Sequence, residues 1–203
     1  MTSPSEETIQ STSLKLSAGC VVVTATTFMP AARAAATSPA RFRLAGAMNP
    51  CPCGEAGPEG CTCSDGERSR YRRRLSGPLV DRFDLRVDVQ RPSPDELLRG
   101  EPGESTAVVA ARVREARARA AARGVTSNAR IPRRRLDDLC PVTPETELVL
   151  EGALTLGRLS ARGLDRVRRV SRTLADLEGH DGPATVEHTR MALILRAQPL
   201  VAA

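Results

Sequence analysis

The stretch "RFRLAGAMNPCPCGEAGPEGCTC" (residues 41–63) decides the fold, because it joins a strand pattern to a loop rich in cysteine, glycine and proline. Residues 41–48 first alternate and then become apolar, as expected of a strand that enters a sheet. The pattern breaks at Asn49-Pro50, where a polar side chain follows the last apolar residue. The end of this strand is therefore expected to carry a metal site, a group that senses a nucleotide, or both.

Two more strands are predicted around this one. "GCVVVTATTF" (19–28) is rich in β-branched residues, and the prolines of 29–40 predict a turn, so a hairpin should lead into the buried strand. "FDLRVDV" (83–89) alternates apolar and charged residues, which predicts a half-buried strand with Phe83, Leu85, Val87 and Val89 facing inward. Residues 66–83, between the cysteine loop and this last strand, are charged and have a helical pattern, with a break at Gly77-Pro78.

The pattern changes to a helical period from Ser105 onward. Helices are predicted at 105–124, 133–140, 143–158, 160–179 and 185–197, with Ser105 or Thr106, Thr143, Ser160 and Thr185 at their starts and Gly124 and Gly179 as stops. The predicted fold class is α/β, consisting of a hairpin plus sheet strands, followed by an all-α bundle.

Composition limits the cellular setting and the partners. The chain has 203 residues and a formal charge of +6, carried by arginine apart from Lys15, which suits phosphate-bearing partners but is equally explained by coding bias. The polar N-terminus predicts no secretory signal, and no apolar run is long enough for a transmembrane helix. The chain is therefore expected to be cytoplasmic, with reduced thiols and no membrane partner.

Six cysteines in a reducing compartment point to metal ligands or buried apolar residues. Four of them form C-x-C, seven residues and C-x-C, a set that suits a structural zinc ion: Cys51, Cys53, Cys61 and Cys63. The alternative is a loop with unligated thiols, because a single residue between two ligands strains joint chelation. Cys20 and Cys140 are expected to be buried, His180 to be exposed, and His188 to lie on a helix surface.

The groups that grip the phosphates and magnesium of ATP are missing from this chain. It contains no GxxxxGK[ST] sequence, and no apolar strand ends in Asp-Glu. Two other residues have features suited to a nucleotide site, each with a simpler interpretation. Asn49 offers an uncharged donor and acceptor but also turns the chain. Arg82, taken by itself, is best explained as a surface partner of Asp81 or Asp84. Arg162 falls in a first helical turn, where its charge opposes the helix dipole and suits a polyphosphate, although composition alone supplies many arginines.

Three segments in succession carry a family resemblance: "FRLAGAMNPCPCG", "YRRRLSGPLVDRFDL" and "LSARGLDRVRRVSRTLADLEG". They resemble motifs of the magnesium chelatase-like AAA+ ATPases, most closely the ComM-type group linked to DNA processing in natural competence. The resemblance covers residues 41–197 and thins over 14–40. The family's N-terminal domain and P-loop are absent, so the chain resembles the C-terminal portion of such an ATPase, truncated relative to the family.

The resemblance implies a role for each of the three polar residues. Asn49 corresponds to the first sensor, Arg82 to the arginine finger that reaches a neighbouring subunit's ATP, and Arg162 to the second sensor. It also implies a ring-forming homo-oligomer, a hexamer, with ATP and magnesium bound only in a complete family member. This chain alone should not hydrolyse ATP.

The implied domain organisation has four parts: a tail at 1–13, the end of an AAA+ α/β core at 14–90 with the cysteine loop at 49–66, a linker at 91–104 and a helical lid at 105–203. A second hypothesis belongs to another class. The chain could be a zinc-stabilised nucleic-acid-binding module, in which Arg33, Arg41 and Arg43 of the hairpin follow a DNA backbone. The near-absence of aromatic residues argues against base stacking.

Overall fold

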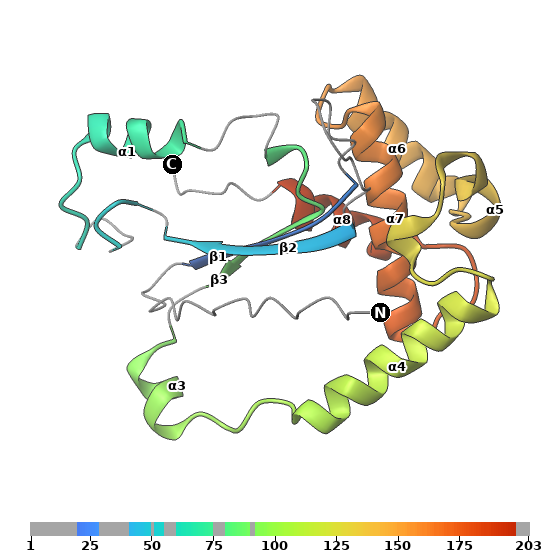
Figure 1. Cartoon of the computed structure of the whole chain (residues 1–203), viewed down its shortest axis with the longest axis horizontal. Helices are drawn as coiled ribbons and strands as arrows, with labels where there is room; N and C mark the ends of the chain where they lie inside the picture. The colour runs from blue at the N-terminus through green and yellow to red at the C-terminus, as the bar shows by residue number, and fades with distance from the viewer. Residues whose placement is uncertain are drawn as a thin grey trace, which may run out of the picture.

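The computed structural model describes residues 20–28, 41–49, 51–54, 60–74, 80–89 and 92–197, with the backbone alone at 20–28, 41–44 and 197 (Figure 1). The tail at 1–13, the turn at 29–40 and Gly77-Pro78 lie outside the described residues, so the predictions for them stay predictions. The same holds for three side chains: Cys20, Arg41 and Arg43. The described part is mostly helical, with one small sheet.

The sheet is antiparallel and has the strand order β2-β1-β3. The central strand β1 (Cys20–Phe28) pairs with β2 (Arg41–Met48) on one side and with β3 (Leu85–Val89) on the other. The predicted hairpin is therefore confirmed in its backbone pairing. Val21 faces Met48 in one neighbour and Asp88 in the other, so β2 and β3 run in the same direction and end at the same edge of the sheet.

The burial of β3 differs from the expected alternation. Phe83, just before the strand, is buried, but Val87 and Val89 are 38% and 41% exposed. Their exposure corrects the sequence-based prediction. Within the described residues, α8 (Val186–Ala197) is the helix with the main contact to β3. Arg196 near the C-terminus of α8 reaches the carbonyl of Phe83, before the start of the strand, whereas Val87 and Val89 lie toward its other end.

The helices begin and end close to the predicted residues. The remaining ones are α1 (Asp65–Arg72), α3 (Pro94–Arg99), α4 (Thr106–Ala122), α5 (Leu136–Leu139), α6 (Pro144–Thr155) and α7 (Ala161–Glu178). Ser105, Thr143 and Ser160 cap their helices through side-chain oxygens, because the first amides of a helix lack intrahelical partners. None of the helices in the described ranges combines the length and apolar character needed to cross a bilayer.

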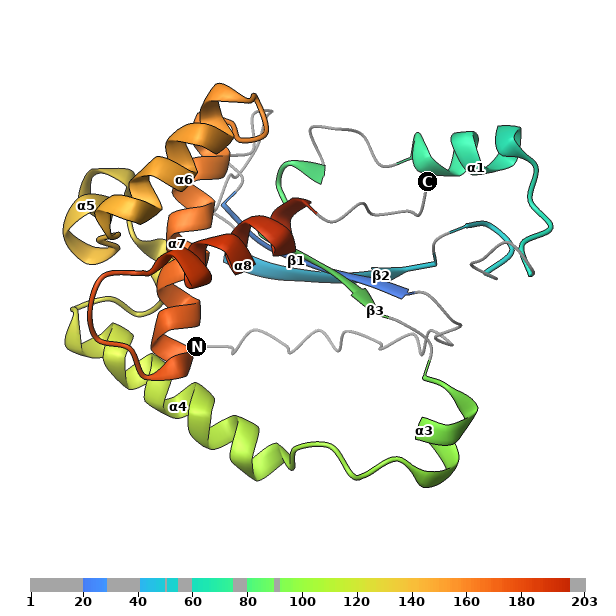
Figure 2. The same cartoon turned by 180° about the vertical axis from the view of Figure 1, so that it is seen from behind.

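Helix α7 is the centre of the helical part, with α4 on one side and α8 on the other (Figures 1 and 2). Ala116 and Ala120 of α4 are buried, and their small side chains allow close helix packing. On the other side of α7, Val167 packs in a cluster with Leu150 and Ala192. These contacts bring α6, α7 and α8 together into one apolar core, as the periodicity of α7 predicts.

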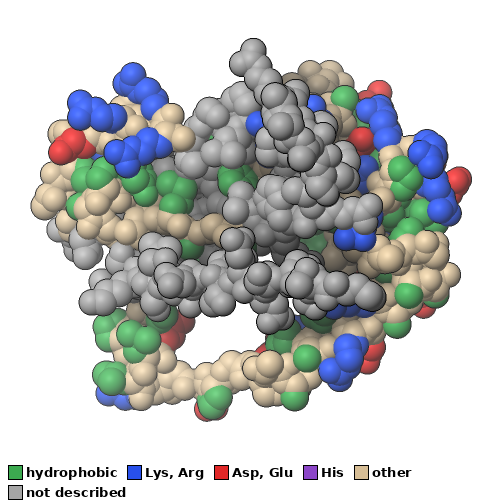
Figure 3. Space-filling view, viewed as in Figure 1, with side chains coloured by type: hydrophobic (Ala, Val, Ile, Leu, Met, Phe, Trp, Pro, Cys, Tyr) green, Lys and Arg blue, Asp and Glu red, His purple; other side chains and the backbone are tan. Residues whose placement is uncertain are grey.

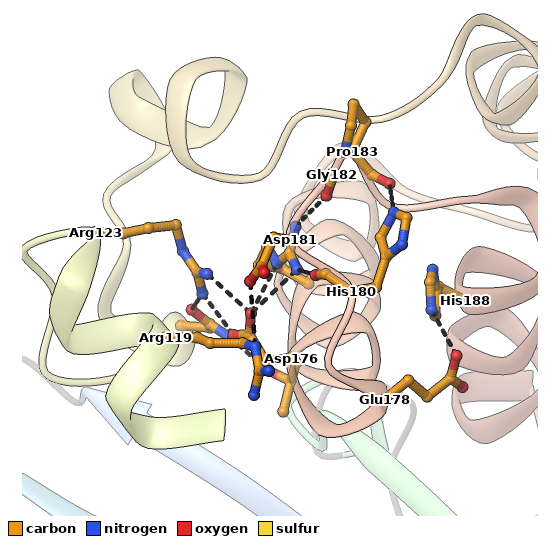
Figure 4. A network of polar contacts seen from close by, with 12 residues as sticks. Arg119, Arg123, Asp176, Glu178, His180, Asp181, Gly182, Pro183 and His188 are labelled. Carbon is orange, nitrogen blue, oxygen red and sulfur yellow. Dashed lines mark hydrogen bonds and ion pairs between the residues drawn. The ribbon is translucent and has the colours of Figure 1, made fainter. Parts of the chain in front are cut away.

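A buried polar network crosses this helical part (Figure 4). Arg172 and Asp176 of α7 are each only 1% exposed and form an ion pair. Arg123 at the end of α4 also contacts Asp176, and Arg172 donates to the carbonyls of His180 and Gly182. Since each buried charge has partners, the network ties α4 and the loop after α7 to the core.

His188 belongs to the same region and corrects a second prediction. Its spacing predicts a place on a helix surface, but its side chain is buried, with 4% exposed. Its Nδ1 accepts from the backbone N–H of Thr185 at 3.0 Å, and its Nε2 lies 2.9 Å from a carboxylate oxygen of Glu178. The ring is buried because it links the start of α8 to the end of α7, a contact that sequence spacing does not reveal.

Candidate functional site

The four cysteines of the loop converge in space. Their sulfur atoms all lie within 4.8 Å of one another, although Cys51 and Cys63 are separated by a loop that is only partly described. The Sγ of Cys61 is 3.7 Å from that of Cys51 and 3.8 Å from that of Cys53. A tetrahedral zinc ion with Zn–S bonds of about 2.3 Å requires sulfur–sulfur distances of about 3.8 Å. The cluster could therefore hold a metal ion of this kind.

Local backbone features bring the cysteines together. Gly54 has a φ of 86°, and its N–H donates to the carbonyl of Cys51 at 3.1 Å, which folds the first C-x-C back on itself. A residue with a side chain is strained in this conformation. Directly after Cys63, Ser64 and Glu67 form a capping box that starts α1. The second C-x-C is thus held by the N-terminus of a helix.

Burial favours the protonated thiol at two of the four cysteines, Cys51 and Cys63. Burial raises the pKa of Cys51 to about 12, and hydrogen bonds from Cys53 and Cys61 add to this. The pKa of Cys63 is raised as well, again with burial as the largest cause. A bound cation would reverse this by stabilising the thiolates, so a metal at this site would bind in exchange for protons.

Asn49 lies at the end of β2, two residues before the first cysteine, and is half-buried. The hydroxyl of Tyr71 on α1 donates to its backbone carbonyl at 3.0 Å. Because Met48 is level with Asp88 across the sheet, Asn49 lies beside the C-terminal end of β3, whereas Arg82 precedes its N-terminal end. The length of β3 therefore separates Asn49 from Arg82, by roughly 13 Å of extended chain or more.

Arg82 lies in the turn at 81–84, directly before β3, and is exposed. The residues on either side of it are fixed. Phe83 is buried, and its N–H donates to the carbonyl of Val80 at 3.2 Å. Asp81 forms an ion pair with Arg196 of α8, and Asp84 forms one with Arg166 of α7 at 3.2 Å. The turn thus presents Arg82 from a held backbone.

Arg162 is in the first turn of α7 and exposed, with Ser160 as the N-cap. It lies one turn before Arg166. Burial lowers the pKa of Arg166, and the positive charges of Arg196 and Arg162 add to this. The structure therefore brings Arg162 and Arg82 to the same region, through Arg166, and leaves Asn49 and the cysteines at the other end of the sheet.

A cavity of about 600 Å³ adjoins this region, between α6, the start of α7 and the end of α8. Its polar lining includes Asp81, Arg86, Ser160 and Arg196, and its apolar wall comes mainly from α6. This volume falls within the range of small-molecule pockets.

Two family models match the chain. Residues 23–97 match the model described as magnesium chelatase, subunit ChlI, and residues 103–196 match magnesium chelatase, subunit ChlI C-terminal. The chain belongs to the magnesium chelatase family. The resemblance predicted from the three motifs is thus confirmed at the level of the family.

Proteins similar to this chain occur in several bacteria. An uncharacterised protein of Mycobacterium tuberculosis is 41% identical over 162 residues, which cover 78% of this chain and 32% of that protein. YifB of Escherichia coli is 39% identical over 81% of this chain and 33% of its own length. The competence protein ComM of Haemophilus influenzae is 37% identical over 70% and 28%. The chain spans about a third of the length of these relatives.

Sequence reasoning missed the residues that hold the predicted site. The sequence pattern singles out neither Arg166 nor Arg196. A usable signal was the pair of aspartates that flank Arg82, because carboxylates beside a buried Phe83 need cationic partners. The partner arginines cannot be identified from sequence spacing, because Arg166 and Arg196 lie 85 and 115 residues after Asp81 along the chain.

Proposed function

We propose that this chain supplies the sensor and finger arginines of a ring-forming, magnesium chelatase-type AAA+ ATPase. In this proposal Arg82 reaches the γ-phosphate of ATP in a neighbouring subunit, and Arg162 binds the nucleotide of its own subunit. The observation that carries the proposal is the turn at 81–84, where an exposed arginine lies next to a buried phenylalanine and between two ion-paired aspartates. An arginine finger needs this combination, because it acts by being positioned on developing charge.

The residues present suit parts of an ATP site and not the whole. Arg162 combines a cation with the N-terminus of an 18-residue helix, which favours a polyphosphate. The P-loop and the acidic strand would come from sequence that this chain does not contain, together with the magnesium ion that they hold. The role of Asn49 as first sensor rests on the resemblance alone.

A hybrid protein tests this function. Residues 23–196 of this chain replace the aligned segment of Escherichia coli YifB, and ATP turnover is measured. We expect the hybrid to hydrolyse ATP and Arg82→Ala to reduce kcat by on the order of 10³–10⁵-fold with ATP binding retained. The matched control is Arg134→Ala, which removes an exposed arginine elsewhere on the chain. An assembled hybrid without ATP turnover, or one indifferent to Arg82→Ala, contradicts the proposal. The 203-residue chain by itself should release no phosphate.

We also propose that the four-cysteine cluster holds one structural zinc ion. The distances from the Cys61 sulfur fit tetrahedral ligation, and the shorter Cys51–Cys53 distance of 3.2 Å would have to widen when a metal binds; four protein ligands leave no open position for chemistry. Metal analysis of protein purified without chelator should give one zinc per chain. Cys51→Ser should lose it, whereas Cys140→Ala, at a buried thiol outside the cluster, should keep it. Folded, metal-free protein whose cluster thiols all titrate freely would rule the zinc out.

One observation favours a nucleic-acid partner as well. Helix α1 follows the last cysteine directly, and exposed arginines gather on and just after it (Figure 3): Arg70, Arg72, Arg73 and Arg74. A basic surface of this kind contacts phosphate backbones without reading sequence. In this proposal the zinc cluster ties α1 to the end of β2, where Tyr71 also contacts Asn49, and α1 touches DNA while the ring hydrolyses ATP.

Duplex binding by this chain tests the DNA contact. Alanine at Arg70, Arg72 and Arg74 should weaken binding of a labelled duplex and reduce its salt dependence, because fewer counterions are released. Alanine at Arg133, Arg134 and Arg135 removes the same charge from another exposed arginine cluster and serves as the control. Equal losses for the two triple variants would indicate a general charge effect and remove α1 as the contact surface.

The division into a core portion and a helical lid, with a linker at 91–104, remains part of this proposal. It is supported by the boundary between the two family matches, which falls at 97–103.

A further inference from the structure

Two arginines from the helical part converge on the turn that carries Arg82. Arg166 of α7 donates to the carbonyl of Asp81 and pairs with Asp84. Arg196 of α8 pairs with the carboxylate of Asp81 and donates to the carbonyl of Phe83 at 3.2 Å. Each arginine therefore holds one carboxylate and one backbone carbonyl of the same turn. We call Arg166 and Arg196 the arginine clamp.

The clamp is more than a surface ion-pair network. The side chains of Arg166 and Arg196 are only 15% and 10% exposed, so both guanidinium groups have largely left water. Solvent-exposed ion pairs contribute little, but removing one partner of a desolvated pair leaves an uncompensated charge. The backbone carbonyls also fix the path of the chain, which a carboxylate on a flexible side chain cannot do.

The start of α7 is shaped to admit the clamp. A Cβ on Gly163 would lie 3.1 Å from the Nε of Arg196 and 2.9 Å from a methyl carbon of Leu159. The absence of a side chain at this position lets Arg196 pass against the first turn of α7. Gly163 is the neighbour of Arg162, so Arg196 passes against the helical turn that carries the proposed sensor.

We propose that Arg166 and Arg196 are positioning residues that fix Arg82 to the first turns of α7, so that Arg82 and Arg162 move as one body. This inference rests on the proposed roles of Arg82 and Arg162. Its consequence is a mechanical link between two ATP sites of a ring. A shift of α7 caused by the nucleotide of its own subunit would carry Arg82 toward or away from the nucleotide of the next one.

Hydrogen exchange on the full 203-residue chain tests the clamp without any nucleotide. Arg166→Gln and Arg196→Gln should raise amide exchange at 81–84, including the Phe83 amide that bonds to Val80. The matched control is Arg168→Gln. Arg168 is also 15% exposed and on α7, but it donates to the carbonyls of Leu136 and Cys140. Arg168→Gln should raise amide exchange at 136–140 and leave exchange at 81–84 unchanged.

A further variant covers the case in which an arginine substitution unfolds the chain. Asp84→Asn keeps both arginines and the side-chain shape but weakens the attraction to Arg166, so exchange at 81–84 should rise while the helices stay protected. Exchange at 81–84 that is equal in the parent chain and in all clamp variants would overturn the proposal.

Turnover in the YifB hybrid separates positioning from general stability. Arg166→Gln should reduce kcat by on the order of 10²-fold, the effect of a misplaced catalytic group, with KM for ATP within about twofold. Arg162→Ala should instead raise KM. If Arg82→Ala abolishes turnover and Arg166→Gln leaves kcat unchanged, the clamp is wrong and the finger stands. If Arg82→Ala has no effect, the proposed function fails, and the exchange experiment still decides whether the clamp exists.

Discussion

At the scale of single residues, the helical part depends on charges that are almost fully buried. Arg172→Ala would leave the carboxylate of Asp176 with fewer partners and two loop carbonyls without a donor. We expect a loss of about 3–5 kcal/mol in the free energy of unfolding, the usual cost of breaking a buried pair. Arg119→Ala removes an ion pair whose partner, Asp181, is 82% exposed, and should cost about 1 kcal/mol or less. Urea denaturation of both variants measures the difference, and equal losses would contradict it.

The cysteine cluster gives a second prediction at this scale. Burial raises the pKa of Cys51 to about 12, so the metal-free thiol stays protonated between about pH 6 and pH 8. Zinc must therefore displace a proton throughout this window, and its apparent affinity should rise with pH, by roughly tenfold per pH unit for each proton displaced. Competition with a chromophoric chelator at several pH values measures this. An affinity independent of pH would mean that the thiols are not the ligands.

At the scale of elements, two glycines in helices have opposite surroundings. Gly163 at the start of α7 faces Arg196 and Leu159, whereas nothing lies within 4 Å of a Cβ placed on Gly152 of α6. Gly163→Ala should therefore destabilise the protein by about 1–3 kcal/mol through overpacking. Gly152→Ala should stabilise it by about 0.5–1 kcal/mol through helix propensity. Thermal unfolding of the two variants gives the signs, and stabilisation by Gly163→Ala would contradict the close packing around the clamp.

The elements themselves were predictable from sequence to a large degree. Helix starts at Ser105, Thr143 and Ser160 follow from capping chemistry, which is local and therefore visible in the sequence. Burial was harder to predict. Val87 and Val89 have the right alternation, but alternation says which residues share a face and not whether anything covers that face.

At the scale of the whole molecule, local convergence of side chains was easier to predict than contacts between distant segments. The convergence of the four cysteines was predicted from spacing, because their loop is short. The clamp was not, because Arg166 and Arg196 meet the turn at 81–84 only after α7 and α8 have packed. The separation of Asn49 from Arg82 likewise follows from strand direction, which single-strand patterns leave open.

The central claim is that Arg82 acts across a subunit interface. The most direct measurement mixes two inactive versions of the YifB hybrid, one carrying Arg82→Ala and the other disabled in the P-loop. If Arg82 works in the neighbouring site, mixed rings regain part of the ATP turnover, because some sites then combine an intact P-loop with an intact finger. If mixing restores no turnover while the subunits demonstrably exchange, Arg82 is not a trans-acting finger, and the turn at 81–84 does not serve a neighbouring ATP site.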